Sequence, residues 1–239
     1  MIAEARSCAA PVARVIVSLK RDESVEQAWA AARNAVALRP WVVALDFCGV
    51  DTRAAPFSSA FAEVVSFAQG TGLPFVTHFA EAAGETDLQA LLDAKPVRLG
   101  HAVWMDDAAR ARVLHERVPI ECCLASNLNT MRRDGHLPAH IDGGLVQAVR
   151  EHHPVAEWHR VGHPFALCCD NIGLLGMPLS ETYYLVAQAL AGDQGPAAAA
   201  ALAWRMARAS IDASCAPPAI KEMLMAQLDA HPFRPSSSS

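Results

Sequence analysis

Short apolar runs of β type, mostly separated by helical patterns, are the feature that most restricts how this chain can fold. Runs of this length between turn signals are typical of buried strands. Strands that alternate with helices predict parallel βα units, which build either an open doubly wound sheet or a closed barrel. Six such runs are present: Val12–Leu19, Trp41–Phe47, Leu73–Thr77, Val97–Gly100, Pro119–Leu124 and Pro164–Cys169.

Helical signals occupy the intervals between the runs and the C-terminal part of the chain. Ser24 and Gln27 have the spacing of a capping box, followed by a core-facing apolar stripe. A second stripe extends from Phe57 to Ala68, and Gly70 is expected to end that helix in a left-handed conformation. Further helices are predicted over Asp106–Glu116, Leu145–Glu151, Leu179–Ala191, Pro196–Ala213 and Pro217–Asp229.

The loops after the strands favour a barrel over an open sheet. No G-x-G-x-x-G or G-x-x-x-x-G-K loop follows any of the six runs, which weakens the dinucleotide-binding and P-loop versions of an open sheet. We therefore predict an α/β fold of the TIM-type (β/α)8 barrel class with extra C-terminal helices, although six units are two fewer than eight. Residues 1–235 are expected to form a single domain, and 236–239 a disordered tail.

Composition argues against several functional classes. Of the 239 residues 52% are hydrophobic, yet no apolar stretch approaches the roughly 20 residues that span a bilayer. The net charge of −5 and the scattered Lys and Arg residues argue against binding to nucleic acid. Glu4 and Arg6 lie where a signal peptide would have its apolar core, so a cytoplasmic location is expected. The strand-like cysteines are predicted to be buried free thiols: Cys48, Cys122, Cys123, Cys168 and Cys169.

One polar residue follows each of the last five predicted strands. These residues are Asp46, His78, His101, Asn127 and Asp170, separated by 32, 23, 26 and 43 residues. The separations are near the roughly 30 residues of a βα unit, so a parallel sheet or barrel brings all five to one face. The C-terminal ends of barrel strands form the active site in barrel enzymes, and histidine and carboxylate are ligands of catalytic zinc.

Some polar residues in the same region have a simpler interpretation. Any βα protein can end its strands with polar residues that satisfy the loop backbone. His78 nevertheless has Glu81 three residues later, a possible proton donor, and Gly100 is expected to let the backbone bend before His101. Glu85 is expected to be a solvated carboxylate at a helix start. The histidines of 131–163 are expected to be exposed rather than metal ligands: His136, His140, His152, His153, His159 and His163.

Several ordered segments resemble the adenosine and AMP-type deaminases, and most closely their N6-methyl-AMP deaminase-like branch. Their order and spacing carry the resemblance, which extends over nearly the whole chain. The segments are LDFCG (45–49), THFAE (77–81), RLGHA (98–102), IECCLASN (120–127), ALCCDN (166–171), LSETY (179–183) and ARASIDASCAPPAIKEML (207–224).

The resemblance implies a zinc-dependent hydrolase that removes an amine from an adenine nucleoside or nucleotide. His78 and Asp170 would be ligands of Zn²⁺, Glu81 would give a proton to a purine ring nitrogen, and His101 would orient the attacking water. The substrate-binding residues would be Asp46, Gly49 and Asn171, the last in place of the family's second aspartate.

The chain departs from this family in one further respect. The family's two other zinc ligands come from an H-x-H pair on the first barrel strand, and no H-x-H precedes His78. The first predicted strand resembles the family's third, so the first two βα units are expected to be missing. The alternatives are a catalytically inactive barrel that serves as a binding module, or a metal-assisted hydrolase of another substrate. The expected ligand is a small purine nucleoside or nucleotide.

Overall fold

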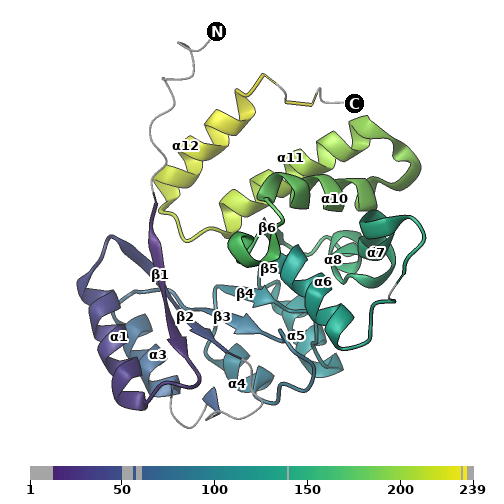
Figure 1. Ribbon diagram of the computed structural model, residues 1–239. Helices are drawn as coiled ribbons and strands as arrows, with labels where there is room; N and C mark the ends of the chain where they lie inside the picture. Colours follow the sequence, from purple (N-terminus) through teal and green to yellow (C-terminus); the bar gives the residue numbers. More distant parts are fainter. Residues whose placement is uncertain (1–12, 50–55, 58–60, 139, 233, 236–239) are drawn as a thin grey trace.

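The computed structural model describes residues 13–49, 56–57, 61–138, 140–232 and 234–235, and contains six parallel strands in chain order (Figure 1). Two strands form one sheet and four form another, and a bridge between Leu45 and Phe75 connects them. The strands are β1 (Val15–Lys20), β2 (Val42–Cys48), β3 (Val76–Phe79), β4 (Arg98–His101), β5 (Ile120–Cys123) and β6 (Phe165–Cys168). The six predicted strands are thus confirmed, with a shift of one to three residues at every end.

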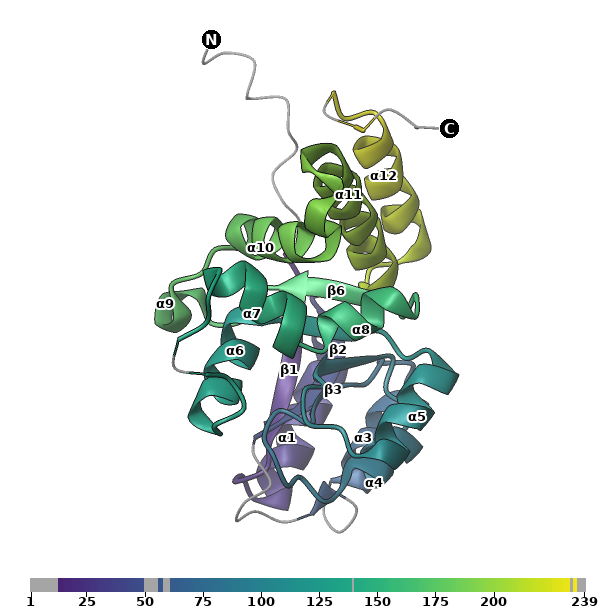
Figure 2. The ribbon, with the colours of Figure 1, turned by 90° about the vertical axis from the view of Figure 1, so that its right-hand side faces the viewer.

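Helices connect the strands and extend the chain beyond the last of them. Helices α1 and α3 pack together, and α1 also contacts β1 and β2, while α10, α11 and α12 lie together at the β6 end (Figures 1 and 2). The helices are α1 (Val25–Ala37), α3 (Ala62–Gly70), α4 (Leu88–Asp93), α5 (Asp107–Glu116), α6 (Leu124–Arg133), α7 (Gly144–His152), α8 (Val155–Arg160), α9 (Ile172–Leu175), α10 (Leu179–Ala191), α11 (Pro196–Ala213) and α12 (Pro218–Asp229). Among these helices none has the length and apolar character needed to cross a membrane.

The ends of two helices test the capping predictions. The capping box at α1 is confirmed, because the Gln27 N–H donates to Ser24 Oγ at 3.2 Å and the Ser24 N–H donates to Gln27 Oε1 at 2.9 Å. The prediction for Gly70 is wrong, because α3 continues through it and Thr71 is the C-cap. The left-handed residue is Gly72, with φ of +82°, two positions later in the turn.

The six strands form an open arrangement that corresponds to consecutive strands of a TIM-type barrel. Within the described part of the chain, β1 pairs only with β2 and β6 pairs only with β5, so the barrel is not closed. The expected tail at 236–239 lies outside the described residues. The described cysteines are all free, and the prediction of burial is confirmed for Cys122 and Cys123, whereas Cys48, Cys168 and Cys169 are half-buried.

A buried ion pair ties the end of β1 to the loops around it. The Arg21 guanidinium donates to the Asp87 carboxylate at 2.6 and 3.1 Å, and both side chains are nearly inaccessible. Asp87 also accepts the Phe57 N–H at 3.0 Å, and Arg21 Nε donates to the Gly49 carbonyl oxygen at 2.8 Å. Because each partner is held by further hydrogen bonds, the pair fixes the loops after β1 and β2 relative to the start of α4.

Replacement of Asp87 by Asn is expected to destabilise the fold by about 3–5 kcal/mol, because it leaves the buried Arg21 charge without its counter-charge. The exposed pair of Arg112 and Asp93 provides a matched control. Asp93→Asn is expected to cost no more than about 1 kcal/mol. Denaturant unfolding of both variants measures the difference, and equal losses would contradict the structural role of the buried pair.

Candidate functional site

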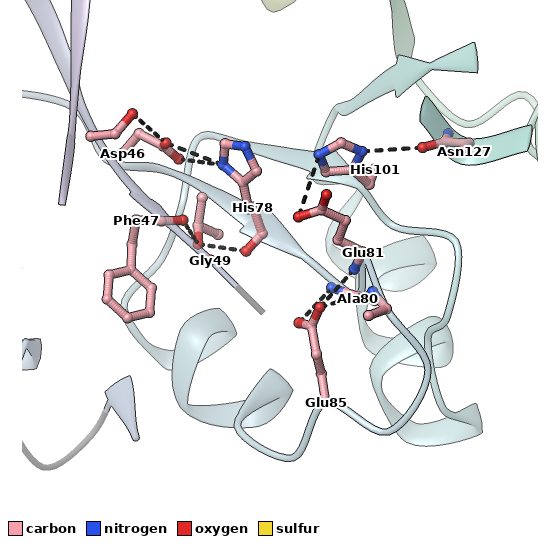
Figure 3. A network of polar contacts seen from close by, with 12 residues as sticks. Asp46, Phe47, Gly49, His78, Ala80, Glu81, Glu85, His101 and Asn127 are labelled. Atoms are coloured by element: carbon pink, nitrogen blue, oxygen red, sulfur yellow. Dashed lines mark hydrogen bonds and ion pairs between the residues drawn. The ribbon is translucent and has the colours of Figure 1, made fainter. Parts of the chain in front are cut away.

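Polar side chains from the C-terminal ends of β2, β3 and β4 meet at one place (Figure 3). The Asp46 carboxylate lies 3.1 Å from His78 Nδ1, and the His78 and His101 rings are 5.2 Å apart between centroids. His101 Nε2 lies 3.9 Å from Glu81 Oε2. The predicted convergence of strand-end residues is therefore observed for Asp46, His78 and His101, and Glu81 lies beside them.

Asp46 holds one ring nitrogen of His78 in place. The carboxylate is buried, and its Oδ2 atom also accepts the Ser18 hydroxyl at 2.8 Å. Burial lowers the pKa of His78, but the hydrogen bond and charge of Asp46, with the charges of Glu81 and Glu121, raise it to about 9 overall. A carboxylate on Nδ1 orients an imidazole whose Nε2 binds a metal, and such a contact increases the ligand's basicity. The structure thus places Asp46 as the partner of His78.

Glu85 supports the loop that carries Glu81. Its carboxylate accepts the backbone N–H groups of Ala80, Glu81 and Ala82 at 3.0, 2.8 and 3.1 Å. The expectation of a solvated carboxylate is wrong, since the side chain turns back into the loop. Burial raises the pKa of Glu85, although these N–H groups and Arg21 oppose the shift. Glu85 therefore holds the backbone of Glu81 in a defined place.

The backbone bends at His101 and not at the glycine before it. His101 and Ala102 have φ of +65° and +53°, whereas Gly100 is an extended residue of β4. The expectation for Gly100 is therefore wrong. A Cβ at Gly100 would lie 3.5 Å from the His78 Cα, so the small residue allows close packing of β4 against β3.

Left-handed backbone recurs at the ends of the site strands. Ala80, His101, Ala102 and Asp170 all have positive φ. Such conformations cost roughly 1–3 kcal/mol each for residues other than glycine, and they concentrate at functional sites. The strain at three separate strand ends supports a functional role for this face of the sheet.

The donor atoms form two overlapping sets that share His101. His78, Glu81 and His101 offer ligand atoms within 4.8 Å of one another, and so do His101, Cys123 and Asp170. Asp170 is thus brought to the cluster by β6, as the sequence predicted.

The other two candidate residues make contacts of their own. Gly49 has φ of +106°, which residues with a side chain rarely adopt, and its carbonyl oxygen accepts a hydrogen bond from Arg21 Nε. The Asn171 carboxamide oxygen accepts the Leu174 N–H at 3.1 Å as the N-cap of α9. Neither contact joins these residues to His78 or His101.

Two buried histidines were not anticipated. His153 and His163 are only 2% and 4% exposed, so the expectation of exposure is wrong for both, although it holds for His136 and His140. His153 lies between α7 and α8 and contacts Asn127, which lies in the first turn of α6 and bonds to His101. The sequence gives no signal that Asn127 and His153 are in contact, because the rest of α6 and the whole of α7 separate them along the chain.

Comparison with known sequences supports one family. A model of the adenosine deaminase family matches residues 2–231. The chain is 28% identical to the N6-mAMP deaminase of Arabidopsis thaliana over 214 residues, which cover 88% of this chain and 54% of the relative. It is 27% identical to the N6-methyl-AMP deaminase of Homo sapiens over 135 residues, which cover 54% of this chain and 34% of the relative. The chain spans about half the length of the Arabidopsis relative. Its match to the human relative covers about a third of that protein.

Comparison with solved structures finds proteins of similar fold, among them deaminases. The crystal structure of Arabidopsis ADAL complexed with IMP has a TM-score of 0.75 at 28% identity, covering 90% of this chain and 57% of that chain. The adenine deaminase from Arthrobacter aurescens has a TM-score of 0.71 at 20% identity, covering 90% and 60%, and shares the fold. A complex of Arabidopsis ADAL with GMP has also been solved, with a TM-score of 0.75 and 28% identity, covering 90% and 58%.

Replacement of Glu85 by Gln is expected to loosen the loop at 80–82, because a neutral carboxamide accepts these N–H groups more weakly than a carboxylate. Charge-assisted hydrogen bonds contribute about 1.5–3 kcal/mol, so amide hydrogen exchange at these residues should accelerate roughly ten- to a hundredfold. Glu116→Gln, an exposed change on α5, is the control and should leave exchange at 80–82 unaltered. Unaltered exchange in Glu85→Gln would contradict the support by Glu85.

His153 is expected to make the fold sensitive to acid. Burial lowers its pKa from 6.5 to about 3, so below pH 6.5 the unfolded chain takes up a proton that the folded chain does not. Stability is therefore lost as pH falls, by about 2 kcal/mol between about pH 7.5 and about pH 5. Denaturant unfolding at both pH values should show this loss, and His153→Phe should reduce it by about that amount. A variant with the full pH dependence would rule out His153 as the cause.

Proposed function

The chain belongs to the adenosine deaminase family, and on that premise we propose that it hydrolytically deaminates an AMP-type nucleotide. The observation that carries this proposal is the cluster of His78, Glu81 and His101 at the strand ends, with Asp170 beside it. The names of the relatives favour N6-methyl-AMP or AMP over adenosine. The products would be an inosine-type nucleotide and methylamine or ammonia. Free cysteines support a reducing, cytoplasmic setting.

The donor set is chemically suited to zinc. Imidazole nitrogen and carboxylate oxygen are preferred ligands of Zn²⁺, and the donor atoms lie within 4.8 Å in each set. His78 and Asp170 would hold the ion, which supplies a nucleophile from water at neutral pH when bound. Catalytic zinc ordinarily takes three protein ligands. Besides His78 and Asp170, the two described donor sets contain Glu81, His101 and Cys123.

The reaction assigns different tasks to the surrounding residues. Water adds to the ring carbon that carries the amine, and Glu81 gives a proton to the adjacent ring nitrogen. His101 orients the water through Nε2, the nitrogen that faces Glu81. The carbon–nitrogen bond to the exocyclic amine then breaks, the amine leaves protonated, and a ring carbonyl remains. Asp46 orients His78 in the structure, and we further propose that Asp46, Gly49 and Asn171 border the substrate.

Glu81→Gln is expected to reduce turnover by about 10²–10⁴-fold, because the carboxamide cannot donate the proton. Ultraviolet absorbance with N6-methyl-AMP, AMP and adenosine measures turnover, and elemental analysis of the purified chain measures zinc. Glu63→Gln, an exposed change on α3, is the control and should retain full activity.

The same assay separates the alternatives. Absence of turnover and of zinc, together with retained binding of a nucleotide, would replace the proposal with a binding module. Turnover of other amides or esters only would indicate a metal-assisted hydrolase of another class.

A further inference from the structure

A line of hydrogen bonds runs from a backbone amide to His101 through two buried side chains. The Val155 N–H donates to His153 Nδ1 at 3.0 Å. His153 Nε2 lies 3.1 Å from Asn127 Nδ2, and Asn127 Oδ1 lies 3.1 Å from His101 Nδ1 (Figure 3). Exposed fractions of 2% for His153, 1% for Asn127 and 3% for His101 show that all three side chains are shielded from bulk solvent.

The number of available protons fixes the direction of each bond. A neutral imidazole has one N–H donor and one acceptor nitrogen. His153 is neutral because burial strongly lowers its pKa. Its Nδ1 accepts from Val155, so its Nε2 must carry the hydrogen and requires an acceptor in Asn127.

The acceptor that faces His153 has to be the carboxamide oxygen of Asn127. The orientation with the amide nitrogen towards His153 would direct two donors at a ring that has one acceptor. In the structure the amide nitrogen is on the His153 side and the oxygen on the His101 side. Oxygen and nitrogen occupy almost the same space, so a half-turn of the amide exchanges them and satisfies His153. After this half-turn the Asn127 NH₂ group donates to His101 Nδ1, so the hydrogen of a neutral His101 lies on Nε2.

We propose that Asn127 and His153 are positioning residues that hold the hydrogen of His101 on Nε2, where it faces Glu81 at 3.9 Å. This inference rests on the proposed deamination for its purpose, because His101 there orients the attacking water. A neutral His101 of this form offers that water an N–H and no lone pair. The proton that the water loses must therefore pass to another group. The Glu81 carboxylate, once it has given its own proton to the ring nitrogen, can accept it, and it is the nearest carboxylate to His101 Nε2 among the donors of the cluster.

The position of the hydrogen can be measured without turnover. Long-range ¹⁵N–¹H correlation spectra of histidine-labelled protein distinguish the two neutral forms of each ring, and His101→Gln assigns the His101 signals by their loss. The wild-type chain is expected to show both His101 and His153 with hydrogen on Nε2. Hydrogen on Nδ1 of His101 in the wild type would overturn the proposal, whatever the activity assay shows.

Two variants and a matched control test the relay itself. Asn127→Asp offers only acceptors, so the His101 hydrogen is expected to move to Nδ1 while His153 is unchanged. His153→Phe frees the carboxamide to turn, and the His101 signals should become those of a mixture. His163→Phe removes a buried histidine that bonds to the Val118 carbonyl oxygen, outside the relay, and should leave His101 unchanged.

Further results of these experiments also test the relay of Asn127 and His153. Unchanged His101 signals in both Asn127→Asp and His153→Phe would overturn the relay. If Asn127→Asp does not fold, the wild-type spectrum and His153→Phe suffice. Where the wild-type chain turns over nucleotide, Asn127→Asp should lower kcat with little change in KM, because the relay does not touch the substrate.

Discussion

The site depends on the Asp46 carboxylate, which joins the two sheets where strand pairing is weakest. Between β2 and β3 the backbone provides a single bridge, Leu45 to Phe75. Side chains complete the connection: Ser18 on β1 donates to Asp46 on β2, and Asp46 binds His78 on β3. The Thr77 hydroxyl on β3 also donates to the Phe47 carbonyl oxygen on β2, at 3.2 Å. A buried carboxylate is costly unless it is fully bonded, so the arrangement that satisfies Asp46 also fixes His78. The Asp46 carboxylate therefore couples the fold to the site.

Strand-end geometry explains why the chemistry-bearing residues could be predicted from the sequence. Parallel βα units place the C-terminal ends of their strands on one face, so Asp46, His78, His101 and Asp170 converge once the six units are recognised. The helix start at Ser24 could also be predicted, because capping requires particular residue types. Strand-end polar residues and helix caps are both local sequence signals, and they recur with each βα unit.

The residues that hold those side chains could not be predicted in the same way. Glu85 resembles any polar loop residue, and its role depends on a turn that directs three N–H groups at one carboxylate. His153 lies in a polar stretch, and its burial depends on how the surrounding helices pack, among them α6 with Asn127. The bend at His101 could not be predicted from local sequence either, because positive φ is ordinarily expected at glycine. Tertiary packing determines all three features, and sequence spacing does not encode it.

The different surroundings of His78 and His101 explain why the two rings have different partners. His78 is partly open to solvent, with 37% of its side chain exposed, and its partner is a carboxylate whose charge favours the imidazolium form. His101 is almost fully buried 5.2 Å away, and the Glu81 carboxylate lies 3.9 Å from its Nε2. The partner of its Nδ1 is a neutral carboxamide, which fixes the ring without adding a further charge. A carboxamide is ambiguous in direction, however, so it needs a further neighbour of known polarity. The Val155 backbone N–H, acting through His153, supplies that polarity because a peptide nitrogen can only donate.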